Sequence, residues 1–257
     1  MFVRSVERLG RVVMGPVDEL GRVAYVLVFG LLSLFLPPYR PRAIVRQMEF
    51  VGVQSLGIVV LAGFFVGGVF ALQSYTLLKL VGAETLVGST VALAVCLELG
   101  PVLTALLVTG RAGSAMAAEL GTMRVTEQID ALEAMAVDPM NYLVAPRIVA
   151  GTLMVPVLTV VFDAVAIFGS YLVGVDMLRI APGPYLYRIE WYLDADDILK
   201  GLVKAAVFGF ILSVVGCSKG FHTHGGAEGV GRATTRAVVI ASVVILITDF
   251  FLTKAMM

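Results

Sequence analysis

Long apolar stretches recur along the chain and are separated by shorter polar segments. An α-helix needs about 20 predominantly apolar residues to cross the hydrocarbon core of a bilayer. Five stretches approach or exceed that length, and they cover residues 51–72, 86–110, 148–175, 201–217 and 237–252. The pattern predicts an all-α membrane protein with about five transmembrane helices.

The chain ahead of the first span contains a shorter apolar segment. Residues 23–36 read VAYVLVFGLLSLFL and end at two prolines, a length that suits an interfacial or re-entrant helix better than a full crossing. Farther upstream, apolar residues recur at helical spacing among arginines, which favours an amphipathic helix in the headgroup layer, with a frayed polar tail as the alternative. These apolar residues are Phe2, Val3, Val6, Leu9 and Val13. We therefore expect no cleavable signal peptide, an N-terminal interfacial region at 1–46, and one transmembrane domain at 47–257.

Composition agrees with a membrane location. Hydrophobic residues make up 59% of the chain and charged residues only 15%, which is far more apolar than an ordinary soluble domain. The 19 basic and 19 acidic residues cancel, so no overall field attracts nucleic acid. The two cysteines, Cys96 and Cys217, lie within apolar runs and are expected to pack as small hydrophobic side chains.

Basic residues predict the orientation, because lysine and arginine accumulate in short cytoplasmic loops. Most of them fall before the first span, after the second and after the fourth, at Arg4, Arg8, Arg11, Arg22, Arg40, Arg42, Arg46, Arg111, Arg124, Arg147, Lys219, Arg232 and Arg236. The other side would hold Lys79, Arg179, Arg188, Lys200 and Lys254. The N-terminus is therefore expected to be cytoplasmic and the C-terminus to lie outside.

Four charged residues fall within the apolar spans: Glu98, Asp163, Lys204 and Asp249. A charge at a helix centre costs roughly 2.5–3.5 kcal/mol on insertion scales, so it usually faces protein or water. These residues either pair between helices and hold the bundle together or line a transport path. Lys204 and Asp249 lie nearer the span ends, where snorkelling to the membrane surface is a further option.

Glu98 is followed at once by Gly100 and Pro101. Proline lacks a backbone N–H and clashes with the carbonyl four residues earlier, here that of Leu97. The helix should bend or open at this point, and a broken helix within a bilayer is tolerated only against protein or a wet cavity. Glu98 is therefore the strongest functional candidate among the four charges.

The first span carries two further patterns. Gly63, Gly67 and Gly68 form a GxxxG pattern, which allows the backbones of two helices to approach closely. Toward its outer end, one helical face collects five side chains that would either pack in the core or line a path for an apolar ligand. They are Phe70, Ser74, Leu77, Leu78 and Val81.

The polar connection between the second and third spans predicts a short amphipathic helix. Thr126 is expected to cap it, Glu127 and Asp130 to occupy its first turn, and the helix to stop before Pro139. Its apolar face would comprise Ile129, Leu132 and Ala136. Such a helix should dock either on a partner or on its own membrane domain.

Several common chemistries are absent from the sequence. The motifs GxxxxGK[ST], GxSxG and HExxH do not occur, so the chain has no P-loop for ATP and no hydrolase or zinc-protease signature. His222 and His224 are the only histidines, and two ligands on a glycine-rich loop make a poor metal site. We expect no metal, no cofactor and no catalytic residue in this chain.

Two blocks of sequence carry a family resemblance. The long block ELGPVLTALLVTGRAGSAMAAELGTMRVTEQIDALEAMAVDPMNYLVAPR and the later GRATTRAVV are similar to the MlaE/YrbE family of ABC-transporter permeases, from about Leu20 to the end of the chain. Some members have a basic residue directly before the Glu-Leu-Gly-Pro motif, where this chain has Leu97. The resemblance therefore does not extend to a headgroup-phosphate contact from that position.

The resemblance implies an assembly and a set of roles. It implies a homodimeric permease of the bacterial inner membrane that moves phospholipids between this membrane and the outer envelope. The partners would be a separate ABC ATPase that binds ATP and Mg²⁺, an MCE-domain protein on the periplasmic side and a small accessory protein. Coupling to the ATPase would involve Thr126, Glu127, Gln128, Asp130 and Glu133. The lipid would meet Glu98, Leu97, Phe70, Ser74, Leu77, Leu78 and Val81.

Two other classes remain open. An ion-coupled secondary transporter would use Glu98, Asp163 and Asp249 as a proton or ion relay and would need no ATPase, but the sequence lacks the internal repeat common in such folds. A structural membrane scaffold would bind no transported lipid.

Overall fold

The computed structural model describes residues 21–30, 32 and 40–256, and every regular element within these ranges is helical. Five helical stretches are long and apolar enough to cross a membrane: Pro41–Lys79, Glu84–Val125, Met140–Met177, Ala195–Phe221 and Gly226–Met256. The prediction of an all-α protein with five membrane-length helices is confirmed. A short apolar helix, Gly21–Gly30, precedes them and matches part of the short N-terminal segment. The amphipathic pattern over residues 1–20 lies outside the described residues.

Most spans are built from more than one helical segment. The first combines α2 (Pro41–Val51), the short turn η1 (Val53–Ser55) and α3 (Leu56–Lys79). The turn η2 (Glu84–Leu86) then leads into the second span, which contains α4 (Val87–Ala94), η3 (Val95–Leu99), α5 (Gly100–Val108), η4 (Thr109–Gly113) and α6 (Ser114–Val125). The third contains η5 (Met140–Val144), α8 (Ala145–Tyr171) and η6 (Leu172–Met177). The last two are the single helices α10 (Ala195–Phe221) and α11 (Gly226–Met256).

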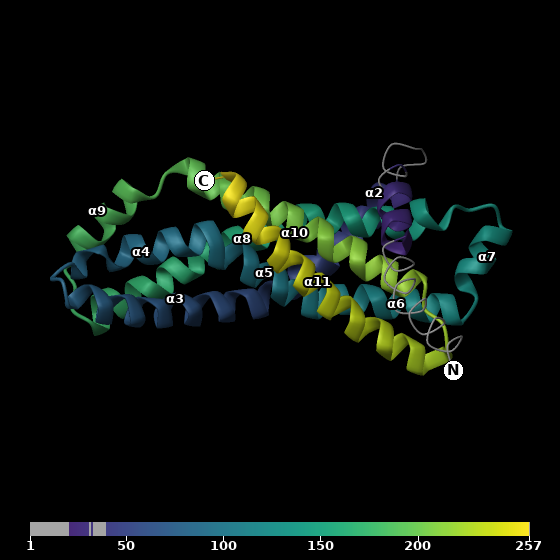
Figure 1. Cartoon of the computed structure of the whole chain (residues 1–257), viewed down its shortest axis with the longest axis horizontal. Helices are drawn as coiled ribbons and strands as arrows, with labels where there is room; N and C mark the ends of the chain where they lie inside the picture. The colour runs from purple at the N-terminus through teal and green to yellow at the C-terminus, as the bar shows by residue number, and fades with distance from the viewer. Residues whose placement is uncertain (1–20, 31, 33–39, 257) are drawn as a thin grey trace, which may run out of the picture.

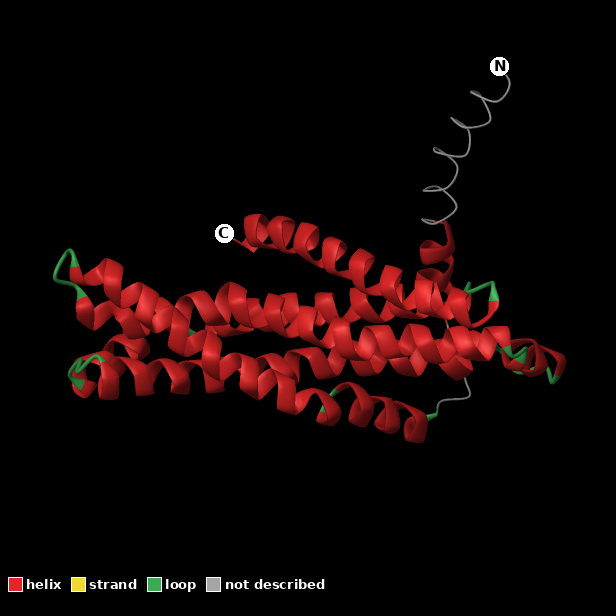
Figure 2. Ribbon diagram, turned by 90° about the horizontal axis from the view of Figure 1, so that it is seen from below, coloured by secondary structure: helices red, strands yellow, loops and turns green. Residues whose placement is uncertain are grey.

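The long helices run side by side along one axis, and α11 crosses the others obliquely (Figures 1 and 2). In the bundle, α8 packs against both α3 and α10, while α10 and α11 both pack against α6. Two short helices lie at opposite ends: α7 (Gln128–Ala134) connects the second and third spans, and α9 (Pro182–Tyr192) connects the third and fourth (Figure 1).

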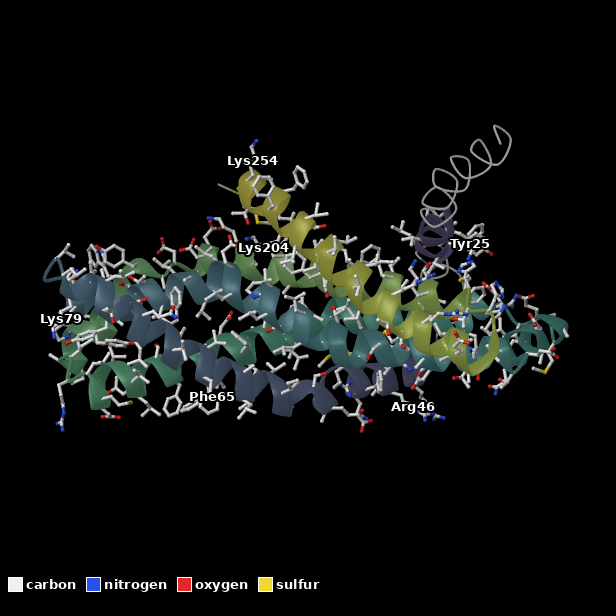
Figure 3. The ribbon with its side chains drawn as sticks, turned by 60° about the horizontal axis from the view of Figure 1, so that its bottom comes forward. Tyr25, Arg46, Phe65, Lys79, Lys204 and Lys254 are labelled. Carbon is white, nitrogen blue, oxygen red and sulfur yellow. The ribbon has the colours of Figure 1, made fainter. Side chains whose placement is uncertain are left out.

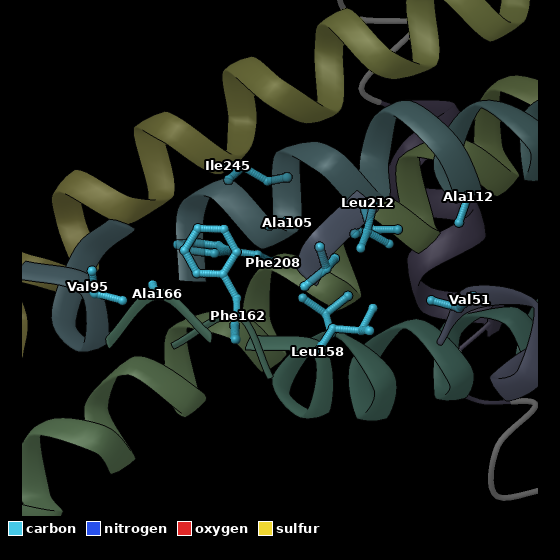
Figure 4. Close-up of a cluster of buried hydrophobic side chains, with 14 of the residues drawn as sticks. Val51, Val95, Ala105, Ala112, Leu158, Phe162, Ala166, Phe208, Leu212 and Ile245 are labelled. Atoms are coloured by element: carbon cyan, nitrogen blue, oxygen red, sulfur yellow. The ribbon is translucent and has the colours of Figure 1, made fainter. Parts of the chain in front are cut away.

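The main core gathers small and branched side chains from nearly every span. Figure 4 shows this cluster, in which Phe162 of α8 and Phe208 of α10 are fully buried among smaller apolar residues. Because the bilayer itself is apolar, helix association here depends on close packing more than on removal of apolar surface from water.

The predicted GxxxG contact is present between α3 and α8. A Cβ atom built on Gly67 would collide with the backbone carbonyl of Ala166, and one built on Gly63 would lie 2.9 Å from the carbonyl oxygen of Phe162. Both glycines are buried. The small residues therefore let the two backbones touch, as the pattern in the first span predicts.

Helix α9 is held to the bundle by one buried tyrosine. The ring of Tyr185 fits between Gly88 of α4 and Gly174 of η6, and its hydroxyl donates a hydrogen bond to Ser170 Oγ at 3.1 Å. Burial raises the pKa of this hydroxyl, and the hydrogen bond partly opposes the shift. Tyr185 thus anchors the connection that leads into α10.

Candidate functional site

A buried lysine gathers the polar groups of three helical segments. Lys204 of α10 donates hydrogen bonds from Nζ to Glu98 Oε1 at 2.8 Å, to Thr253 Oγ1 at 2.8 Å and to the Leu97 carbonyl oxygen at 3.1 Å. Asp249 Oδ1 lies 3.4 Å from the same nitrogen. An ammonium group has three N–H donors, so these three hydrogen bonds satisfy it completely. We call Glu98, Lys204, Asp249 and Thr253 the charge cluster.

Proline at position 101 explains why a carbonyl is available to Lys204. Pro101 has no N–H, so it cannot donate to the carbonyl of Leu97 as a residue in a regular α-helix would. The helix widens into a π-helical segment over Val95–Leu99, and α5 begins at Gly100. The expected break at the Gly-Pro pair is thus a π-helical segment, a feature that often marks functional sites. The freed carbonyl of Leu97 accepts the lysine.

Close packing brings α10 against this segment. A Cβ atom on Gly201 would collide with the carbonyl oxygen of Cys96, so only glycine allows this approach. Gly201 and Lys204 are three residues apart and therefore lie on one face of α10. On α11, Asp249 and Thr253 are four residues apart, and the Thr253 hydroxyl also lies 3.0 Å from Glu98 Oε1. Each helix thus supplies its polar groups from a single face.

The charge cluster is buried on one side and open on the other. The side chain of Lys204 is 3% exposed, that of Asp249 is 19% exposed and that of Glu98 is 39% exposed. Figure 3 places Lys204 between the two ends of the bundle, near the crossing of α10 and α11, whereas Lys79 and Arg46 lie toward opposite ends. The snorkelling option for Lys204 is wrong, because its ammonium finds all its partners inside the protein.

The four intramembrane charges therefore separate into two groups. Glu98, Lys204 and Asp249 form an interhelical ion-paired network, as the pairing alternative stated. Asp163 is buried on α8 against Gly100, and its Oδ1 has no hydrogen-bond partner. Pairing is wrong for Asp163, since it takes part in none of the ion pairs found in the described ranges. A relay that uses Glu98, Asp163 and Asp249 together has no continuous hydrogen-bonded connection in that part of the chain.

The face predicted on the first span does not stay together. Ser74 is buried, and Phe70 and Leu78 are partly buried against the main core. Leu77 and Val81 are instead 68% and 75% exposed. Packing of α3 against its neighbours covers one half of the face and leaves the other half at the surface. The five residues therefore do not form one continuous surface along α3.

The connecting helix α7 differs from its prediction at both ends. Thr126 does not cap it, because Thr126 closes the preceding helix and its Oγ1 donates to the Thr122 carbonyl at 2.8 Å. Glu127 instead occupies the N-cap position in a left-handed backbone conformation, with φ of 60°. The helix ends at Ala134, so Ala136 lies beyond it and is exposed. The turn between two helices overrides the local capping signal.

The two sides of α7 nevertheless match its amphipathic pattern. Ile129 is fully buried in a small cluster with Leu120 and Met140, so the apolar side docks on the membrane domain itself. Glu127, Gln128, Asp130 and Glu133 are exposed. Asp130 is also engaged within the chain, by an ion pair with Arg124 at 2.6 Å. The acidic side of the helix faces outward.

The histidine loop offers no metal site in the described ranges. His222 Nδ1 lies 3.0 Å from the Ser218 carbonyl oxygen, and burial lowers the pKa of this imidazole. No group of three or more possible metal-binding side chains occurs in that part of the chain.

Sequence reasoning missed two polar residues that organise the bundle. Thr253 completes the charge cluster, and its spacing from Asp249 on one helix was the available signal. Arg111, counted only as an orientation signal, ties the second span to the first. Its guanidinium contacts Ser55 Oγ at 2.8 Å, Gln54 Oε1 at 3.2 Å and the Phe50 carbonyl. No local pattern specifies these partners, which are more than 50 residues away.

The fold and the charge cluster together define a class. A bundle of five membrane-length helices with a partly open charge cluster between them, and without a nucleotide-binding motif, is the architecture of a polytopic transport permease. The profile of a family described as Permease MlaE matches residues 44–255. The chain belongs to the MlaE permease family.

Individual relatives agree with this assignment. The chain is 43% identical to the intermembrane phospholipid transport system permease protein MlaE of Haemophilus influenzae, over 100% of this chain and 98% of that protein. It is 41% identical to a probable ABC transporter permease protein of Rickettsia bellii, over 99% and 98% of the two chains. It is also 41% identical to the Arabidopsis thaliana protein TRIGALACTOSYLDIACYLGLYCEROL 1, chloroplastic, over 83% of this chain and 61% of that protein. The membrane-length helices and the bacterial relatives indicate a bacterial inner-membrane protein.

Proposed function

We propose that this chain is the membrane-spanning subunit of an ABC-type transporter that moves phospholipids between the inner membrane and the outer envelope. The observation that carries the proposal is the charge cluster, because it keeps the Glu98 carboxylate 39% exposed within a bundle of membrane-length helices. Glu98 is already paired with Lys204, and its exposed part is free to accept a hydrogen bond from a hydroxyl or ammonium group of a lipid headgroup. The Haemophilus relative, named for intermembrane phospholipid transport, supports the same substrate class.

The proposed assembly has several parts. Two copies of this chain form a homodimer, and a separate ATPase binds ATP and Mg²⁺, because the chain has no P-loop. An MCE-domain protein receives or delivers lipid on the periplasmic side, and a small accessory protein accompanies the ATPase. The N-terminus is cytoplasmic and the C-terminus periplasmic, following the distribution of basic residues. Leu77 and Val81 lie at the outer end of α3, where their exposure suits contact with a lipid or with the second copy.

The first test replaces Glu98 with glutamine. The amide oxygen of glutamine still accepts hydrogen bonds from Lys204 and Thr253, so folding should change by less than about 1 kcal/mol. The partly exposed negative charge is lost, and we expect ATP-dependent transfer of a fluorescent phospholipid, with the ATPase co-reconstituted, to fall about tenfold. Glu190→Gln, an exposed change on α9, is the matched control and should transfer lipid like the parent protein.

The outcome separates the candidate functions. Equal transfer by the Glu98→Gln and Glu190→Gln variants would contradict a role for Glu98 in transport. Transfer that follows a pH gradient and continues without ATP would instead favour the ion-coupled transporter. A chain that carries no lipid under either condition would behave as a scaffold.

The second test concerns the contact with the ATPase. The exposed acidic side of α7 should meet a basic groove, so a charge reversal there should weaken the complex. Asp130 is a poor choice because its reversal also breaks the ion pair with Arg124. Glu133→Lys avoids this complication, and we expect it to weaken ATPase binding about fivefold in a pull-down titration, since a close charge pair contributes roughly 1 kcal/mol or more.

The control for this test is Glu190→Lys, which makes the same charge change at the opposite end of the bundle. Thermal unfolding of the permease alone should be the same for both variants. If Glu133→Lys binds the ATPase as tightly as Glu190→Lys does, the ATPase docks on another surface.

A further inference from the structure

A pocket of about 1000 Å³ lies away from the charge cluster, at the end of the bundle that carries α7 (Figure 1). Residues of α2, α6 and the start of the third span line it, together with Arg40, Gln54, and Gln128 of α7. Four arginines and two glutamates are among them, so the lining has a net positive charge: Arg40, Arg42, Arg46, Arg147, Glu49 and Glu119. Arg46, one of the lining residues, is labelled in Figure 3.

One of these arginines is buried and incompletely satisfied. Arg147 is only 5% exposed; it donates from one Nη to the Leu143 carbonyl at 2.8 Å and from the other to Glu119 Oε2 at 2.9 Å. Its Nε is buried and has no hydrogen-bond partner. A buried donor without an acceptor is unfavourable, more so on a charged group. Arg147, which lines the pocket, therefore lacks one acceptor.

Gln47 on α2 adds a complementary requirement. Gln47 lines the same pocket, and its Oε1 atom is buried and has no donor partner. A ligand that satisfies both side chains presents an anionic oxygen and a hydroxyl or amine. The phosphate of a glycerophospholipid, with its glycerol or ethanolamine substituent, has both groups. Inorganic phosphate shares the anionic oxygens but not the adjoining substituent.

The remaining arginines suit recognition of an anion at a membrane surface. The guanidinium of Arg40 stacks over the Tyr142 ring, 4.0 Å from its centroid, which fixes one wall of the pocket. Arg42 and Arg46 are exposed on the helix that begins the first span. The pocket therefore lies at the start of the first membrane-length helix, where we infer that lipid headgroups are located. Arginine pairs with phosphate through parallel N–H donors.

We propose that this pocket binds the phosphate headgroup of a phospholipid in the adjacent leaflet, at a site separate from the transport path. Arg147 Nε donates to a phosphate oxygen, Arg42 adds charge at the rim, and Gln47 accepts from the headgroup substituent. The bound headgroup joins α2 to α8 and thereby stabilises the start of the first span. This proposal does not depend on the transported substrate.

The test measures binding of dihexanoyl-phosphatidylglycerol and of inorganic phosphate to the full-length chain in detergent, by calorimetric titration. Arg147→Lys keeps the positive charge but removes Nε, and we expect it to weaken lipid binding about tenfold. Arg42→Gln should weaken it about fivefold through loss of a charge near the headgroup. Lys254→Gln removes an exposed charge at the far end of α11 and should bind like the parent (Figure 3).

Absence of binding to the parent, or equal binding by Arg42→Gln and Lys254→Gln, would overturn the site. If Arg147→Lys does not fold, the comparison of Arg42→Gln with Lys254→Gln still tests whether the pocket binds the lipid. Inorganic phosphate that binds as tightly as the lipid would overturn the headgroup assignment in favour of a free anion. Since binding is measured without the ATPase, failure here is distinguishable from failure of the proposed transport function.

Discussion

Replacement of Lys204 with methionine should destabilise the protein by about 3 kcal/mol in its free energy of unfolding. The side chain of methionine fills similar space but cannot donate to Glu98, Thr253 or the Leu97 carbonyl. Two carboxylates, Glu98 and Asp249, then face each other without a cation. The expected loss is at the low end for a broken buried ion pair, because Glu98 remains half open to its surroundings. Equilibrium unfolding in mixed micelles measures the effect.

Lys200→Met is the matched control for this prediction. Lys200 lies one turn earlier on α10 and pairs with Asp196 at 2.9 Å, but its side chain is 35% exposed. A surface pair contributes little, so the Lys200→Met variant should unfold much like the parent protein. Adding Glu98→Gln to Lys204→Met should recover part of the lost stability, since one uncompensated charge disappears. Equal stability of the two lysine variants would show that the charge cluster does not hold the three helices together.

Replacement of Gly67 with alanine should cost about 3 kcal/mol or more, although alanine is intrinsically the better helix former. The added methyl group would collide with the backbone carbonyl of Ala166, and a backbone cannot turn away as a side chain can. The helices α3 and α8 must then separate along the contact that Gly63 and Gly169 also share. We expect a lower melting temperature and a lower yield of folded protein.

Gly57→Ala provides the comparison on the same helix. A Cβ atom at Gly57 meets nothing within 4 Å, so the change should be neutral or slightly stabilising. The two substitutions are chemically identical and should differ in sign. Gly67→Ala with the stability of Gly57→Ala would mean that the α3–α8 contact is looser than the structure places it.

The features that the sequence predicted correctly have local physical causes. The number of membrane-length helices follows from comparing the length of each apolar stretch with the thickness of the bilayer. The break after Glu98 follows from the missing N–H of Pro101, which acts wherever the helix packs. The contact at Gly63 and Gly67 follows from the absence of side chains on one helical face. Each of these arguments needs only neighbouring residues.

The features that sequence missed depend on which elements meet. Thr126 carries a good capping side chain, but the turn between α6 and α7 uses it to close the earlier helix. Asp163 had the same chemical reason to pair as Glu98, yet α8 turns it toward Gly100 instead of toward a base. The pocket lined by Arg40, Arg42, Arg46 and Arg147 combines residues from segments about 100 positions apart. No pattern of residue spacing in the sequence therefore predicts it.

By itself the sequence determined that this protein has five membrane-length helices, that the helix departs from regular α-helical geometry at Glu98, and that α3 has a face for close packing. Hydropathy, proline and glycine act through the backbone next to them, so these consequences hold in any arrangement of the helices. Only the tertiary structure decided that Lys204 satisfies the carbonyl freed by Pro101 and that Asp249 and Thr253 join it. A hydrogen bond acts over about 3 Å, and only the packing of α10 and α11 against the second span brings those atoms that close.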